Sequence, residues 1–280
     1  MAPSNTGKPI VVETFTERLE AWYERNGKSI LIVVGIALAL YFGYRIFKSS
    51  KVKKTETANV AYGKALDNYR QGLADPEEAT GKEKLSAAIT GAREVNSEYG
   101  TLPVGLEAQL LAANAQYKLA LLESGQEGAD AHLEKARDEF TKYINQASGS
   151  KKAAGYLGLG NVLENLSFIK SNESLMTEAV EAYREALAAS EGTFLADEVR
   201  VSLARALSGM NSPAAQEEAK KLYETVAKKE IGNLVSPDSF KNLDNATRVE
   251  GVTRDEVVDF LSQKDATYKK LAEDSLHRLK

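Results

Sequence analysis

The chain has 280 residues, a length typical of one or two domains. Its 36 Lys and Arg against 40 Asp and Glu give a net charge of -4, which excludes a globally basic nucleic-acid binder. The absence of Cys excludes disulfides, thiol catalysis and Cys-based zinc sites, and the two histidines, His132 and His277, are too few for a His-rich metal centre. We interpret both histidines as surface residues.

Residues 1–29 form an N-terminal tail with an amphipathic second half. A capping box at 14–17 (Thr-Phe-Thr-Glu) predicts a helix start. The apolar residues that follow lie on one helical stripe: Phe15, Leu19, Trp22 and Tyr23. This pattern predicts a short interfacial helix with Trp22, the only Trp, as a membrane anchor.

Residues 30–47 form the most apolar segment, beginning ILIVVGIALALYFGY. As a helix they would extend about 27 Å, close to the hydrocarbon thickness of a bilayer. Arg45 interrupts the run near its end, where its side chain can reach the headgroups as a second anchor. A buried core helix and a cleaved signal peptide are the alternatives. We favour an uncleaved transmembrane helix, because no later segment is as apolar and no cleavage-type small-residue pair ends the run.

Residues 48–56 are predicted to be a basic juxtamembrane stalk. Five cations and no acids lie between 45 and 54, so residues 55–280 carry the remaining -9. The cation count on the two flanks weakly favours a cytoplasmic C-terminal side.

Residues 57–230 have the pattern of helical repeats, and no alternating strand pattern occurs in them. Three segments each place an aromatic residue four positions after a small Ala. The small residues are Ala136, Ala179 and Ala219, spaced 43 and 40 residues apart, and Phe140, Tyr183 and Tyr223 follow them. A period of this length predicts stacked two-helix units.

These units resemble the tetratricopeptide repeat. Tyr156, Leu159, Gly160 and Leu163 match its first helix, and the Ala179 segment matches its second. The units exceed the standard 34 residues, and the standard Trp and closing Pro are absent. The resemblance implies a tetratricopeptide-like α-solenoid, with an irregular helical bundle as the alternative. Together with the apolar run, this predicts an all-α fold in which a single transmembrane helix is followed by the solenoid.

Residues 231–280 are predicted to cap the solenoid. A polar stretch precedes a second capping box at 253–256, which predicts a helix start. We expect one helix from this box and a separate last helix from about Ala266.

The N-terminal layout resembles the YfgM-like family. The resemblance is carried by Arg-Asn-Gly-Lys at 25–28, the apolar run, Gly-Tyr-Arg-Ile-Phe at 43–47 and Val-Ala-Tyr-Gly-Lys-Ala at 60–65. It implies a bacterial inner-membrane protein with a cytoplasmic N-terminus, a periplasmic repeat domain, and links to the Sec translocon and periplasmic chaperones. This orientation is opposite to the one that the cation count favours. The chain is longer than expected for that family, because it has an extra segment after about residue 230.

The tetratricopeptide resemblance also implies a partner-binding groove lined by first helices. Its groove positions fall on Leu111, Ala115, Lys118, Leu157, Asn161, Glu164, Val201, Arg205 and Ser208. Asn161 could hold a peptide backbone and Arg205 a carboxylate. Ordinary solvated helix positions are the alternative interpretation.

No catalytic, cofactor or metal-binding pattern is found. The Gly-rich stretch at 155–160 lacks nucleotide-loop spacing. We therefore expect a protein that binds protein partners and is not an enzyme, with no cofactor, no nucleic acid and no small-molecule substrate. Two functions remain open: a membrane-anchored interaction module near the translocon, or a structural scaffold subunit of a larger envelope assembly.

Overall fold

The structure is a computed structural model that describes residues 52–75, 78–123, 125–229 and 254–279, with side chains from 262 onward in the last range. These ranges contain helices and no strand. The helices are the one over residues 52–74, α2 (Glu78–Tyr99), α3 (Pro103–Leu122), α4 (Gln126–Gln146), the short η1 (Gly149–Lys151), α5 (Lys152–Lys170), α6 (Glu173–Ser190), α7 (Ala196–Ser208), α8 (Pro213–Ala227) and α10 (Arg254–Arg278).

The expected transmembrane helix at 30–47, the interfacial helix, and the anchors Trp22 and Arg45 lie outside the described residues. Within the described ranges, no helix has the length and apolar character needed to cross a membrane. The chain divides into two compact units, Met1–Thr57 and Ala58–Lys280, and the helical stack belongs to the second.

Residues in the turns determine where the helices end and begin. Ser171 adopts a left-handed conformation after α5 (φ 49°), and the side chain of Asn172 then accepts a hydrogen bond from the Ser174 amide at 2.9 Å. Ser212 caps α8 in the same way, with Pro213 at the first helical position. These local signals place helix boundaries where the sequence has small polar residues and Pro.

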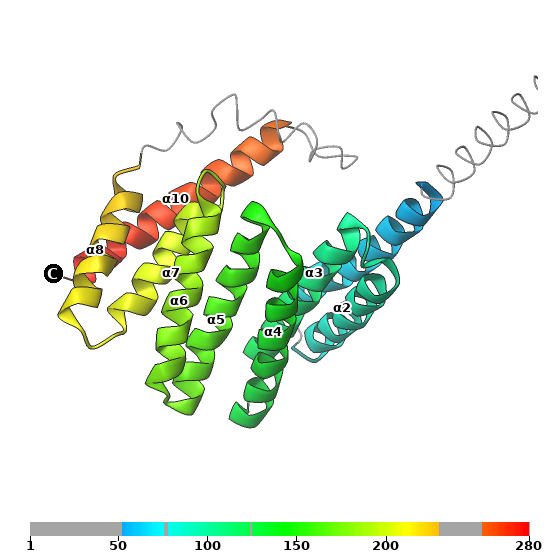
Figure 1. Cartoon of the computed structure of the whole chain (residues 1–280), viewed down its shortest axis with the longest axis horizontal. Helices are drawn as coiled ribbons and strands as arrows, with labels where there is room; N and C mark the ends of the chain where they lie inside the picture. Colours follow the sequence, from blue (N-terminus) through cyan, green and yellow to red (C-terminus); the bar gives the residue numbers. More distant parts are fainter. Residues whose placement is uncertain (1–51, 76–77, 124, 230–253, 280) are drawn as a thin grey trace, which may run out of the picture. The chain divides into compact units, whose positions relative to one another are not determined.

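The helices pack in chain order as antiparallel neighbours, α2 on α3, α3 on α4, and so on to α8 (Figure 1). In addition, α3 contacts α5, and α5 contacts α7. The first helices of successive pairs (52–74, α3, α5 and α7) therefore lie next to one another. The second helices of the pairs are α2, α4, α6 and α8. This is the arrangement that the sequence predicts for stacked two-helix units.

The repeated small and large residues of the second helices form the core. Ala136, Ala179 and Ala219 are fully buried, and Phe140 and Tyr183 are fully buried beside them. Glycines of α5 make room for the rings: a Cβ on Gly160 would lie 2.5 Å from the Tyr183 ring. Small residues of the first helix thus pack against large residues of the second helices.

The C-terminal region differs from the prediction in one respect. The structure has a single helix, α10, where we expected two helices with a break before Ala266. No Gly or Pro occurs in α10, so nothing in its sequence interrupts the helical backbone. Helix α10 packs on α8 and α7, with Ala272 buried in their shared core (Figure 1).

Candidate functional site

The candidate site is the side of the first helices that carries the groove residues predicted on α5 and α7, here called the first-helix face. In three of the first helices, a buried small residue packs within the helix pair: Ala65, Ala113 and Gly160. The residues one, four, five and eight positions after each of these are therefore equivalent among the three helices.

On α5 the first-helix face carries three of the predicted groove residues. Leu157 is buried, Asn161 is half-buried, and Glu164 is buried with its carboxylate engaged. On α7 Val201 is buried, Ser208 is half-buried, and Arg205 is exposed along half of its side chain.

The structure brings Asn161, Glu164 and Arg205 together in one polar cluster. Arg205 donates from Nε to Glu164 Oε1 at 2.9 Å and from Nη2 to Oε2 at 2.7 Å. The Tyr183 hydroxyl lies 2.7 Å from Glu164 Oε2 and 2.8 Å from Asn161 Oδ1. The guanidinium fork that the sequence offered for a partner carboxylate is thus occupied by a carboxylate of the chain itself.

Two further residues extend this cluster toward α3. Asn165 donates to the Tyr117 hydroxyl at 3.1 Å and to the Asn161 carbonyl at 2.8 Å. We name the set of Tyr117, Asn161, Glu164, Asn165, Tyr183 and Arg205 the Arg205 cluster. Tyr117 and Asn165 were missed at the sequence level, although Asn165 lies one helical turn after Asn161 and so shares its face.

Electrostatics in the Arg205 cluster follow from burial and from the ion pair. Hydrogen bonding to Glu164 raises the pKa of Arg205 further above its usual value. Burial, and next the nearby Glu164 charge, raise the pKa of the Tyr183 hydroxyl, which keeps this group a neutral donor. The cluster therefore holds a fixed set of charges and joins α5, α6 and α7.

On α3 the half-buried positions are offset by one residue from two of the predicted groove residues. Leu111 and Ala115 are buried against α2 and the helix over 52–74. Their neighbours Leu110 and Asn114 are half-buried, as are Tyr117 and Lys118. The offset arises because Ala113 is the small residue of α3 that packs in the core with Ala136 and Phe140 of α4, and Asn114 does not. Of the three predicted residues, only Lys118 therefore lies on the first-helix face.

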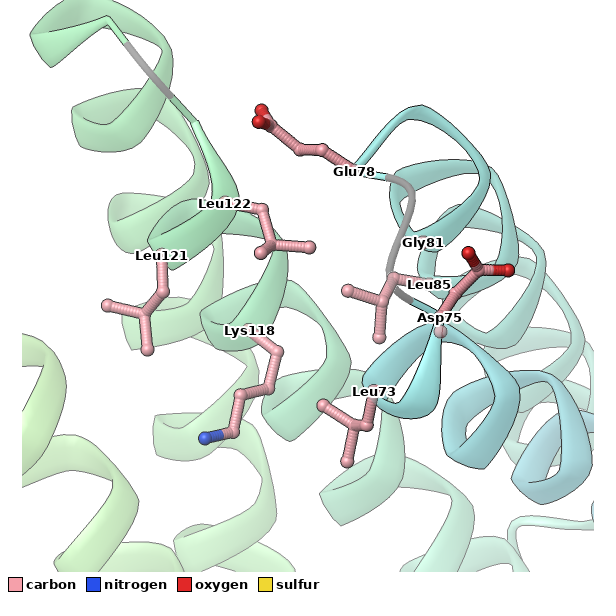
Figure 2. Close-up of a pocket in the computed structure, with 9 residues that line it drawn as sticks. Leu73, Asp75, Glu78, Gly81, Leu85, Lys118, Leu121 and Leu122 are labelled. Atoms are coloured by element: carbon pink, nitrogen blue, oxygen red, sulfur yellow. The ribbon is translucent and has the colours of Figure 1, made fainter.

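Lys118 contributes to a pocket of about 390 Å³ at the end of α3. Figure 2 shows Lys118 between Leu121 of the same helix and Leu73 at the end of the helix over 52–74. Gly81 and Leu85 of α2 complete the inner wall, and the remaining lining residues are Gly72, Asp75, Glu78 and Leu122. The Lys118 ammonium lies 5.8 Å from the Tyr117 ring centroid.

His132 is not the open surface residue that we expected. Its side chain is 24% exposed; its Nδ1 contacts the Gln116 amide, and its Nε2 lies 4.0 Å from Glu123. The neighbouring acids Asp130 and Glu134 instead both pair with Lys170. Across the described ranges, no group of three or more His, Asp or Glu side chains is placed to hold a metal ion.

Comparison with known proteins gives a domain class. A family model described as a tetratricopeptide repeat-like domain matches residues 20–149. The match covers the apolar run, the helix over 52–74 and helices α2 to α4, and the structure continues the same helix-pair stacking through α8. The fold and this domain class together indicate a protein–protein interaction module.

The other comparisons add little. Comparison with curated proteins gave no significant match. A solved structure described as "Computational Design of Self-Assembling Cyclic Protein Homooligomers" is similar at 14% sequence identity over 80% of this chain and 84% of that chain. Its TM-score of 0.21 is too low to support an inference.

Proposed function

We propose that this protein is a membrane-anchored interaction module of the bacterial cell envelope that holds protein partners on its first-helix face, in association with the Sec translocon and periplasmic chaperones. The observation that carries the binding part is the stack of first helices, because repeat units of this kind present a continuous surface that no single unit could form.

The membrane and envelope parts of the proposal rest on the sequence. The family match begins at residue 20, so the apolar run at 30–47 lies inside the matched region. The inner-membrane location, the periplasmic repeat domain and the translocon association follow from the resemblance of the N-terminal layout to the YfgM-like family.

Site-specific photo-crosslinking in cells tests the binding part. A crosslinker at Asn114, on the first-helix face, should capture one defined protein, and a secretion or folding factor is expected. A matched crosslinker at Thr141, exposed on α4, should capture little. Equal capture at both positions, or none at Asn114, would contradict the proposal.

A reporter fused after Lys280 tests the orientation. Periplasmic activity is the expected result, and cytoplasmic activity would overturn the translocon-side proposal. The scaffold alternative makes a different prediction, namely a stable complex of fixed stoichiometry that survives substitutions on the first-helix face.

A further inference from the structure

We infer that the partner of this protein engages it through an amphipathic helix with an acidic flank, which lies across the ends of the first helices on an apolar row formed by Leu73, Leu121 and Phe168. This inference rests on the proposed function, because it names the site and the chemistry of the partner that the first-helix face would hold.

The apolar row is a repeated feature of the fold. Leu73, Leu121 and Phe168 each lie eight residues after the buried small residue of their helix, and their side chains are 50%, 49% and 68% exposed. Exposure at one such position is ordinary, whereas here it recurs at equivalent positions of three successive first helices. The row ends at α7, where the equivalent residue is Ser212.

Between the helix over 52–74 and α3, the row borders the pocket. Leu73 and Leu121 line its mouth and Leu85, fully buried, lies at its inner wall (Figure 2). A volume of about 390 Å³ is at the lower end of the range for ligand pockets, enough for apolar side chains projected from a partner.

A helix fits the row better than an extended segment does. An extended backbone needs hydrogen-bond partners along its length, and the side chains of the row supply none. A helix satisfies its own backbone and buries only side chains. Neighbouring packed helices have axes about 8–10 Å apart, and seven residues of a partner helix advance about 10.5 Å, so apolar residues at i and i+7 would meet successive members of the row.

Lys118, beside the centre of the row, offers a cation to an acidic residue of the partner. Of the residues three positions before the apolar ones, Arg70 pairs with Asp67 at 3.9 Å, whereas Lys118 forms no ion pair within the described ranges, and the third is Asn165. Two carboxylates, Asp75 and Glu78, also line the pocket, and Glu78 pairs with Lys82 at 2.9 Å. A Glu or Asp on the partner helix would complete the pairing of Lys118 at the edge of the apolar contact.

The experiment measures binding of the purified full-length chain to a labelled designed helical peptide by fluorescence anisotropy. The peptide carries Leu at i, i+7 and i+14 with Glu beside the central Leu, and a second peptide has Lys in place of Glu. Protein variants are Leu121→Asp and Lys118→Glu. The matched control is Val60→Asp, since Val60 is 59% exposed on the same helix as Leu73 and outside the row.

The expected result is at least a tenfold loss of affinity for the acidic peptide in L121D and no change in V60D. Lys118→Glu should lower the affinity for the acidic peptide and raise the affinity for the Lys peptide. A merely destabilised protein would not show this reversal. Equal losses in L121D and V60D, or equal affinity of a proline-rich, non-helical version of the peptide, would overturn the inference.

Failure of this inference can be separated from failure of the proposed function. If the crosslinker at Asn114 captures a defined partner in cells and L121D leaves that capture intact, the first-helix face binds a partner elsewhere than on the apolar row. In that case the inference is wrong and the proposed function stands. Loss of capture in L121D with retention in V60D supports both.

Discussion

Arg205 of α7 holds Glu164 of α5 in a two-point ion pair, with Nε–Oε1 and Nη2–Oε2 distances of 2.9 and 2.7 Å. The two residues lie 41 positions apart, and Glu164 is buried while Arg205 keeps half of its side chain in solvent. The pair therefore joins two successive helix pairs of the stack, and its loss leaves a buried carboxylate with only the Tyr183 hydroxyl as a side-chain donor from another helix.

We expect Arg205→Ala to lower the free energy of unfolding by about 1–3 kcal/mol, since it leaves a buried charge without its cation. Arg205→Lys should recover part of the loss, because Lys supplies the charge without the planar fork. Urea unfolding of the full chain measures both. The control is Arg70→Ala, whose exposed pair with Asp67 at 3.9 Å should contribute about 0.5 kcal/mol or less. A loss in R70A equal to that in R205A would contradict the assignment.

Close packing of glycine against aromatic rings leads to a second prediction. A Cβ on Gly158 would lie 2.1 Å from Phe140 Cε1, deep in the core, where neither helix can shift independently. Gly158→Ala should therefore destabilise the protein by about 1–3 kcal/mol or more, in spite of the better helix propensity of Ala. Gly63→Ala is the matched control: a Cβ at this position would have no atom within 4 Å, so propensity alone should stabilise this helix by about 0.5–1 kcal/mol. Opposite signs in thermal unfolding would verify the packing, and a neutral G158A would refute it.

The same packing explains which parts of the fold could be predicted from the sequence. Each of Ala136, Ala179 and Ala219 is followed four residues later by an aromatic residue. This local pattern can be read from the sequence, and it is the pattern that the buried contacts between the helices require. In α5, the glycines face rings of two second helices: Gly158 lies against Phe140 of α4, and Gly160 lies against Tyr183 of α6. In α3 the stretch Leu-Leu-Ala-Ala-Asn-Ala offers several small residues, and periodicity alone does not decide which of them packs in the pair.

The polar partners of the candidate site could not be predicted for a different reason. A residue pattern shows that Arg205 and Glu164 share a face with other first-helix positions, but their contact depends on how closely α5 and α7 approach. That distance is set by the side chains buried between α5, α6 and α7, including Tyr183, whose hydroxyl reaches both Asn161 and Glu164. The apolar row was missed because each member is a single exposed residue in the sequence, and only the stack aligns the three.

The register of α3 provides a third prediction. Ala115 is fully buried against α2, so Ala115→Leu should overpack this contact and lower the free energy of unfolding by about 1–3 kcal/mol. The adjacent substitution Asn114→Leu places the same side chain on the half-exposed first-helix face and should change stability by about 0.5 kcal/mol or less. Urea unfolding distinguishes the two. If the larger loss occurred in N114L, the register described for α3 would be wrong and the groove register predicted from the sequence would be restored.

Acidification provides a fourth prediction, centred on His132. Burial, and next the charge of Lys135, lower the pKa of His132 below 6.5, against the opposing effect of Glu123; the charge of Lys82 acts in the same direction as Lys135. The contact with Gln116 agrees with this direction, because an amide N–H donates only to an unprotonated ring nitrogen.

The lowered pKa means that the unfolded chain binds the proton more readily than the folded chain. Stability contributed by neutral His132 is present above pH 6.5 and falls as the pH drops through the folded-state pKa, by at most about 1.4 kcal/mol per pH unit. In urea unfolding at pH 7.5 and 5.5, the wild type should lose more stability on acidification than His132→Gln does. His277→Gln, at an exposed position of α10, should behave as the wild type, whereas a loss in H132Q equal to that of the wild type would assign the acid sensitivity to other groups.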